Sequence, residues 1–379
     1  MAIYNSMYII LWVMAIISYS KNIKISQVFF LQVLILSLFT ALRFQTGYDW
    51  PVYQAYYNSA DNSSVSFEIG FATLISIFKY LGLSFNVFVF FVSIVEVLLL
   101  AKVIKYFFPR QCVLIFAIMF SLADFFLIPM FALMRQGLAV SIFLYGLMLY
   151  HKGHFNKAKT LFAISVIFHL SSILIIACTY LVINFKFSRK TLLFVFILSL
   201  LTYLFAFDLI GYLISIIIPY IDQKYEMYMQ RDTYNASGLY RIVFSIVSIF
   251  TCFLIYRYGS RNGVIGINKN ILVYALLAVI FPLLFYNYPT ISTRYQYFYA
   301  IFMIGLSLSL LDYLKSNNLF IVILLMALLF YVPFYRFLTN PLSIVFVPYQ
   351  NMITYDESNS TGTTRTDELM SQLYQLWNK

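Results

Sequence analysis

The chain has 379 residues, of which 62% are hydrophobic and only 10% are charged, and its mean hydropathy is +0.85. A soluble domain carries roughly 25% charged residues, so this composition excludes a water-soluble globular protein and predicts a surface that faces lipid. The net charge is +11, but the lysines and arginines stand singly or in small groups between apolar stretches, which argues against nucleic-acid binding.

The apolar stretches predict helices that cross a bilayer, whose core of about 30 Å needs about 20 apolar residues per helix. In chain order they lie near residues 3–20, 26–43, 84–105, 111–130, 135–150, 160–183, 239–258, 270–289, 294–314 and 319–337. The sequence therefore predicts an all-α, polytopic transmembrane domain over residues 1–340. The polar tail 341–379 follows, and its segment 366–378 predicts a short amphipathic helix resting on the membrane surface.

Two further segments leave the number of spans open. Residues 190–218 are long for one helix and are interrupted by Asp208 and Gly211, so they form one tilted span or two short ones. Residues 67–82 are short and begin with the charged Glu68, which favours a helix at the membrane surface over a full span. The total is about ten to thirteen spans at the length that a bilayer requires.

Basic clusters set the predicted orientation, because positive residues concentrate in cytoplasmic loops. These clusters are Lys21 with Lys24, Lys102 with Lys105 and Arg110, Lys152 with Lys157 and Lys159, and Arg257 with Arg261 and Lys269. A further cluster at 186–190 does not fit this scheme. The opposite, outer face then carries the loops 44–66 and 219–238.

Aromatic residues gather in these outer loops. Tyr53 lies in the first loop, and Tyr225, Tyr228 and Arg231 lie in the second. Flat aromatic faces beside polar groups suit the packing of sugar rings. An aromatic belt at the membrane interface explains them equally well, and both interpretations stay open.

Arginines at the predicted outer ends of helices are unexpected, because positive residues are scarce on that side. They are Arg43, Arg135, Arg241 and Arg294. Guanidinium groups are permanently charged and planar, so several of them converging from different helices could hold a pyrophosphate. The alternative is that they snorkel, or that they pair with nearby acids such as Asp49 and Glu68.

Three residues near the outer face could act as acids or bases. Asp49 lies in the first outer loop, Glu68 follows it, and His169 lies in the apolar stretch IFHLSS. A histidine within a membrane segment can instead serve as a hydrogen-bond partner between helices. Glu96 and Asp124 also lie in predicted spans, with either structural or functional roles.

The motifs of several enzyme classes are missing. The sequence has no P-loop, no G-x-G-x-x-G and no H-E-x-x-H, and its three cysteines do not have the spacing of metal ligands. We therefore expect no metal and no cofactor. A glycosyl donor, if there is one, would be lipid-linked rather than nucleotide-linked.

Four short motifs occur in a characteristic order. They are Arg43-x-x-x-Gly47-x-Asp49-x-x-x-Tyr53, then Glu68-x-Gly70-Phe71, then Arg135-Gln136-Gly-Leu-Ala139, then Phe168-His169-x-Ser171-Ser172. In this order the chain resembles the EpsG family, which belongs with the Wzy-type polymerases of bacterial O-antigen, capsule and exopolysaccharide. The pairs Arg294-Tyr295 and Pro348-Tyr349 resemble the family more weakly.

The resemblance implies a membrane glycosyltransferase with an architecture like that of the GT-C enzymes. Such a polymerase lies in the bacterial cytoplasmic membrane, with its active site facing outward. It would join undecaprenyl-pyrophosphate-linked repeat units, which serve as donor and acceptor, with a separate chain-length regulator as a further partner. Undecaprenyl pyrophosphate would be the leaving group.

The charges suggest a mechanism for such a reaction. Arg135, helped by Arg43, Arg294 and Arg241, would neutralise the departing pyrophosphate. Asp49, Glu68 or His169 would take the proton of the attacking hydroxyl, and we favour Asp49 or His169 without choosing between them.

Two other functions remain open from the sequence. A transporter or flippase of lipid-linked glycans would also need many helices and a cationic cavity, although the sequence lacks the inverted repeats common in transporters. A membrane O-acyltransferase is less well supported and rests mainly on His169.

Overall fold

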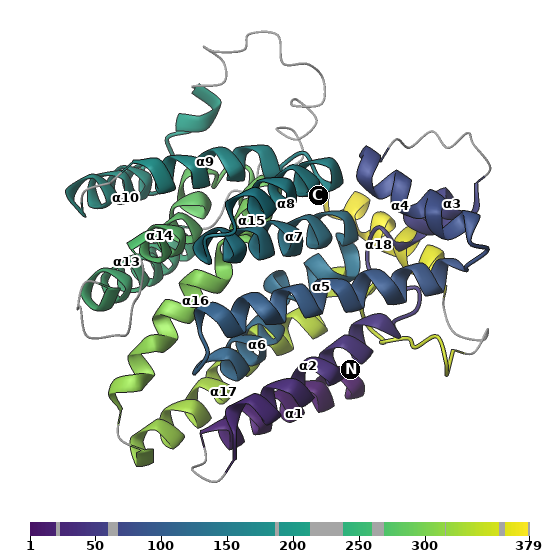
Figure 1. The fold of residues 1–379 in the computed structure, drawn as a ribbon, viewed down its shortest axis with the longest axis horizontal. Helices are drawn as coiled ribbons and strands as arrows, with labels where there is room; N and C mark the ends of the chain where they lie inside the picture. The colour runs from purple at the N-terminus through teal and green to yellow at the C-terminus, as the bar shows by residue number, and fades with distance from the viewer. Residues whose placement is uncertain are drawn as a thin grey trace. The chain divides into compact units, whose positions relative to one another are not determined.

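The structure is a computed structural model that describes residues 1–19, 23–59, 67–185, 189–212, 238–259, 269–314, 316–355 and 361–377. In these ranges every regular element is a helix, which confirms the predicted all-α class. One isolated antiparallel β-bridge joins Arg43 to Asn351. The chain forms two compact units (Figure 1), one of residues Met1–Ser172 with Leu314–Lys379 and the other of Ile173–Tyr313.

The first unit is a bundle in which α5 is a central element. Its helices are α1 (Ala2–Ser18), α2 (Ile25–Ala41), α3 (Trp50–Asn58), α4 (Ile69–Tyr80), α5 (Phe85–Phe107), α6 (Cys112–Ser121), α7 (Met134–His151), α8 (Phe155–Phe168), α17 (Ser316–Thr339) and α18 (Gly362–Trp377). Helix α5 packs between α2 and α7, and α7 in turn packs against α8. Every residue of α6 is buried, so this helix is enclosed by its neighbours.

The second unit is built around α14. Its helices are α9 (Ser172–Asn184), α10 (Arg189–Leu204), α13 (Gly238–Gly259), α14 (Lys269–Leu284), α15 (Pro289–Gln296) and α16 (Ala300–Leu308). Helix α14 packs against α10, α13, α15 and α16. Within this unit, the Tyr288 hydroxyl donates to Asp208 at 2.7 Å, and the backbone N–H of Gly211 donates to the same carboxylate at 2.8 Å.

The exposed surface of these helices is apolar, as expected of a chain embedded in a membrane. Two helices in the described residues, Phe85–Phe107 and Asn318–Thr339, are long and apolar enough to cross a bilayer, and nine shorter apolar helices accompany them. Only 11% of the apolar stretch in Asn318–Thr339 is buried, and Leu328 and Leu329 are 63% and 69% exposed. Apolar faces of this extent would not be stable in water, so we assign the chain to a membrane. The GT-C-like architecture stays a prediction.

Three predicted spans are interrupted in the structure. In the stretch 111–130 the α-helix ends at Ser121, and a short 3₁₀ helix (Ala123–Phe125) and a π-helix (Ile128–Ala132) follow it. The stretch 160–183 is broken at His169, whose backbone is extended, and 294–314 is divided between α15 and α16. Because irregular backbone at membrane depth is tolerated only where protein or a cavity satisfies it, such breaks commonly mark functional positions.

The C-terminal part of the chain packs against the loop between α2 and α3. The N–H of Phe44 donates to Gln350 O at 2.9 Å, and the N–H of Gly47 donates to Val345 O at 3.0 Å. The guanidinium of Arg365 in α18 is buried and donates to Pro348 O, to the side chain of Gln350 and to Gln45 O. The predicted amphipathic helix of the tail is thus held on the segment that contains Asp49.

Candidate active site

The loop between α2 and α3 is shaped by Gly47. Its φ is +110°, and a Cβ at this position would fall on the carbonyl oxygen of Phe131, so only glycine fits. The turn places Asp49 directly before α3, but the Asp49 side chain does not cap that helix. Instead, its Oδ2 accepts a hydrogen bond of 3.3 Å from the hydroxyl of Tyr53, one turn further along α3.

Helix α4 lies directly against the end of α8 because Gly70 has no side chain. A Cβ on Gly70 would stand 2.8 Å from the carbonyl oxygen of Ile167. This close approach of two backbones brings Glu68, the residue that precedes α4, next to His169, which ends α8. The close packing of α4 against α8 therefore explains why a glycine stands at position 70, two residues after Glu68.

Glu68 is the centre of a polar network. Its Oε2 lies 2.5 Å from Nη1 of Arg135, and its Oε1 lies 2.8 Å from Nδ1 of His169. The side chains of Glu68, Arg135 and His169 are 15%, 24% and 14% exposed, so each can be reached from outside. Asp49, Tyr53, Glu68, Arg135 and His169 are called the Glu68 network below.

The guanidinium of Arg135 is held by aromatic rings as well as by Glu68. Its Cζ lies 4.5 Å from the centre of the Phe67 ring, and its Nε lies 3.5 Å from the hydroxyl of Tyr53. Phe67 was not among the residues singled out from the sequence, and its only signal was its position beside Glu68. Stacking of this kind fixes the plane of the guanidinium and leaves Nη2 without a hydrogen-bond partner among the described residues.

The network holds Glu68 in its ionised form. Burial alone would raise the pKa of its carboxyl, but the hydrogen bond to His169 and the charge of Arg135 oppose this, and the pKa falls from 4.5 to about 2. Burial also raises the pKa of the Tyr53 phenol, which therefore remains a hydrogen-bond donor. An ionised Glu68 can only accept, so His169 donates from Nδ1, and Nε2 is the ring nitrogen that this contact leaves available.

The other predicted residues lie outside this network or outside the described residues. The Arg43 side chain is 1% exposed, and its Nη1 donates to Thr40 O at 2.7 Å and to Ser93 Oγ at 2.5 Å. The buried carboxyl group of Glu96 is close enough to interact electrostatically with the guanidinium of Arg43, but the two side chains form no ion pair. Arg294 lies in α15 of the second unit, and its part in the site stays a prediction. The side chain of Arg241, together with Tyr225, Tyr228 and Arg231, falls outside what the structure describes.

Tyr53 is buried rather than open to a sugar. Its side chain is 1% exposed, and its ring packs against Phe67 and Phe71 with centroids 5.4 Å away in each case. The hydroxyl, between Asp49 and Arg135, is therefore the part of this residue that reaches the network. No cluster of three or more His, Cys, Asp or Glu suited to a metal occurs in the described ranges.

Replacing Gly70 with Ala should separate Glu68 from His169. In an ordinary helix this change stabilises by roughly 0.5–1 kcal/mol, but here the new methyl meets the Ile167 carbonyl and we expect destabilisation of about 1–3 kcal/mol. Thermal unfolding of the purified protein measures the sign, and Thr73→Ala on the exposed side of α4 is the control. A rise in melting temperature for Gly70→Ala would show that α4 and α8 are not in this contact.

The ion pairing of Glu68 should depend on pH in a defined window. A carboxyl whose pKa is lowered on folding stabilises fully above its ordinary value of 4.5, and this contribution disappears as the pH falls toward about 2. The difference in melting temperature between the wild type and Glu68→Gln should be larger at pH 5 than at pH 3, because the contribution of the ionised carboxylate shrinks below pH 4.5. The exposed Glu368→Gln should show no such trend, and a Glu68→Gln difference independent of pH down to pH 3 would contradict the pairing.

The fold and the network together define a helical, membrane-embedded protein with an ionised, partly exposed site at one end of its first unit. The EpsG family model matches residues 26–351, and the chain belongs to this family of Wzy-type and exopolysaccharide-polymerase-like proteins. No curated protein and no solved structure matches the chain. Family membership indicates a role in polysaccharide polymerisation.

Proposed function

We propose that the protein is a glycosyltransferase that polymerises undecaprenyl-pyrophosphate-linked repeat units at the outer face of the bacterial cytoplasmic membrane. The observation that carries this proposal is the Glu68 network, in which an imidazole and a guanidinium are positioned by the same ionised carboxylate. Both groups lie within residues 26–351, the range that the family model matches. A chain-length regulator remains a further part of the proposal.

The orientation is supported by where charges lie within the first unit. The Glu68 network is at the end of the bundle where α7 begins, whereas Lys102, Lys105 and Lys152 are at the opposite end of α5 and α7. Because lysines concentrate on the cytoplasmic side, the network would face outward. Lipid-linked repeat units on that side of the membrane could then reach it.

Arg135 is the group that would hold the pyrophosphate. Its Nη1 is directed to Glu68, its face lies on Phe67, and its side chain is 24% exposed. The free Nη2 can donate to a phosphate oxygen without breaking the pair with Glu68. The fixed guanidinium would stabilise the negative charge that grows on the leaving group.

His169 is the group that would act as the general base. Glu68 is a poor base because its pKa is about 2, but it orients the ring and stabilises the positive charge that His169 acquires with a proton. Asp49 shares its Oδ2 with the Tyr53 hydroxyl, and this contact ties it to Arg135 rather than leaving it free for a substrate. We therefore assign proton transfer to His169 and a positioning role to Asp49.

The proposed step is a displacement at the anomeric carbon of the donor glycan. The hydroxyl oxygen of the acceptor repeat unit forms a bond to that carbon while the bond from the carbon to the pyrophosphate oxygen breaks. The proton of the hydroxyl passes to Nε2 of His169, and the electron pair of the broken bond leaves with undecaprenyl pyrophosphate. The products are a longer lipid-linked glycan and the free diphosphate lipid.

A glycan ladder from a strain without the gene tests the function. We expect single capped repeat units without longer polymer, and recovery of the ladder when the wild-type gene is restored. Absence of repeat units outside the cell would indicate a flippase instead. A full ladder that lacks only acetyl groups would indicate an acyltransferase, and either result would overturn the proposal.

A further inference from the structure

A basic pocket lies between α5 and α7, at the ends of these helices that are remote from the Glu68 network. Its volume is about 420 Å³, and it is lined by Lys102, Lys105, Tyr106, Tyr145, Met148 and Lys152. From Arg135 to Lys152 the chain rises about 25 Å at 1.5 Å per helical residue. The pocket is therefore a separate site of the first unit and does not belong to the proposed catalytic machinery.

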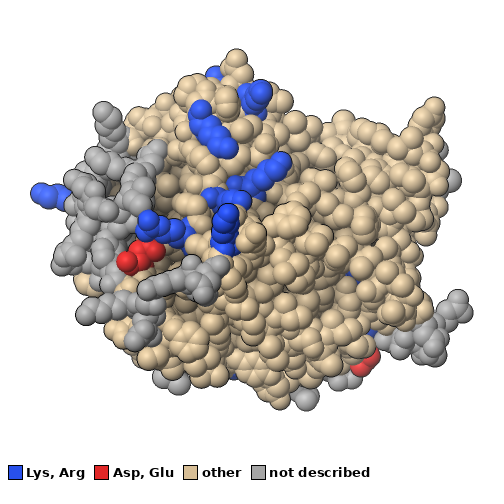
Figure 2. Space-filling view, turned by 60° about the horizontal axis from the view of Figure 1, so that its bottom comes forward, with Lys and Arg blue, Asp and Glu red and all other residues tan. Residues whose placement is uncertain are grey.

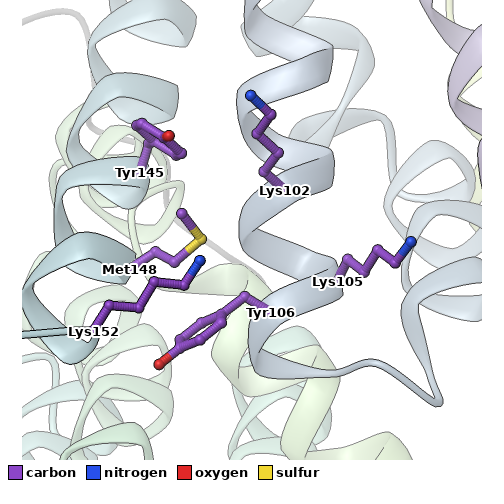
Figure 3. A pocket seen from close by; sticks show the side chains of 6 residues that line it. All are labelled: Lys102, Lys105, Tyr106, Tyr145, Met148 and Lys152. Atoms are coloured by element: carbon purple, nitrogen blue, oxygen red, sulfur yellow. The ribbon is translucent and has the colours of Figure 1, made fainter.

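The two helices present their lysines to this pocket from both sides. In Figure 3, Lys102 extends from α5 toward Tyr145, and the amino group of Lys152 lies beside Met148 and Tyr106, whereas Lys105 points away from the gap. The Nζ of Lys102 is 5.7 Å from the centre of the Tyr145 ring, and the Nζ of Lys152 is 4.8 Å from that of Tyr106. Rings placed in this way hold ammonium groups without neutralising them.

These ammonium groups lack acidic partners within the part of the chain that the structure describes. The two ion pairs found there both involve Glu68, at the other end of the bundle. Figure 2 shows a face of the molecule on which Lys and Arg side chains gather and Asp and Glu are scarce. Ammonium groups without acidic partners create a positive potential at the pocket, which is therefore suited to a negatively charged ligand.

The rest of the pocket lining determines what kind of anion fits. Met148 is buried and forms an apolar wall, and Tyr106 and Tyr145 add aromatic faces. Helix α5 is long and apolar enough to cross a bilayer, and Lys102 and Lys105 lie near its end, so we infer that this end lies where the bilayer meets water. A lipid headgroup offers a phosphate for Lys102 and Lys152 together with glycerol and acyl carbons for the apolar wall.

We propose that the pocket between Lys102 and Lys152 binds the phosphate of an acidic phospholipid. Phosphate is the chemistry recognised, and the membrane is its source. A soluble phosphate ester would meet the same two lysines but would leave the apolar wall uncovered.

The test is lipid retention by the purified full-length protein, measured by native mass spectrometry. The probes are phosphatidylglycerol, phosphatidylcholine and glycerol 1-phosphate. The double variant K102Q/K152Q should retain phosphatidylglycerol about 30-fold less well than the wild type, since each lysine near an anionic membrane surface contributes about fivefold. The wild type should retain phosphatidylcholine only as weakly as the double variant retains phosphatidylglycerol.

Two further variants separate charge and folding effects from site effects. The pair K24Q/K159Q removes the same charge from exposed positions outside the pocket and should bind phosphatidylglycerol as the wild type does. The pair K102R/K152R keeps the charge and should restore binding. Equal retention by wild type and K102Q/K152Q, or equal retention of both phospholipids by the wild type, overturns the site. Full displacement of phosphatidylglycerol by equimolar glycerol 1-phosphate would show that the pocket binds a soluble phosphate ester rather than a membrane lipid.

Discussion

Arg135→Ala is expected to abolish detectable polymer, with a fall in turnover of about 10²–10³-fold or more, as when a preorganised donor to a developing oxyanion is removed. The reason is local: Nη2 is the hydrogen-bond donor of the network that is free for a phosphate oxygen, and Phe67 and Glu68 hold it in place. Arg135→Lys keeps the charge but loses the planar fork and the stacking, so we expect only partial recovery. The measurement is the rate at which purified variants extend a lipid-linked oligosaccharide.

Arg336→Ala is a matched control for this variant. Arg336 is exposed near the end of α17. The segment that follows this helix pairs with the loop between α2 and α3. Removing the charge of Arg336 should leave turnover within about twofold of the wild type, as expected for an exposed charge that forms no ion pair with the described residues. Wild-type rates for Arg135→Ala, or an equal loss for both variants, would rule out a specific role for Arg135.

His169→Ala is expected to lower kcat by about 10²–10⁴-fold, the usual contribution of a positioned general base. The KM for the lipid-linked donor should change little, because Arg135 and its ring contacts remain. Glu68→Gln should also lower kcat, since an amide cannot stabilise the positive charge on His169. Steady-state kinetics of both variants at several pH values separates binding from proton transfer.

Asp49→Asn provides the comparison that distinguishes the two candidate bases. Its Oδ2 accepts from Tyr53, and an amide oxygen can still do so, so we expect a loss at least about tenfold smaller than that of His169→Ala. A larger loss for Asp49→Asn than for His169→Ala would transfer the role of base to Asp49. Equal wild-type kcat in both variants would exclude a side-chain base in this network.

Much of this site could be predicted as a set of residues but not as an arrangement. Asp49, Glu68, Arg135 and His169 were each singled out because ionisable groups are costly near a membrane. The contact that organises them joins Glu68 to His169 across 101 positions of the chain. Nothing in the local pattern of either segment specifies that pairing, so the central position of Glu68 emerged only from the fold.

Burial separated arginines that the sequence could not tell apart. Arg43 and Arg135 both follow apolar stretches at the same end of the first unit, yet Arg43 is 1% exposed and bonded to Thr40 and Ser93. The helix break at His169 was hidden for a similar reason, because the apolar composition of 160–183 is continuous. Apolar composition predicts well which segments lie in the membrane, but it contains little information about where a helix is interrupted.

The most direct measurement of the central claim uses the purified protein with a defined undecaprenyl-pyrophosphate oligosaccharide and no nucleotide sugar. The wild type should produce glycans that grow by whole repeat units and should release undecaprenyl pyrophosphate in equal amount, whereas His169→Ala and Arg135→Ala should produce neither. No extension by the folded wild type, or extension that both variants retain, would contradict the assignment of glycosyl transfer to the Glu68 network.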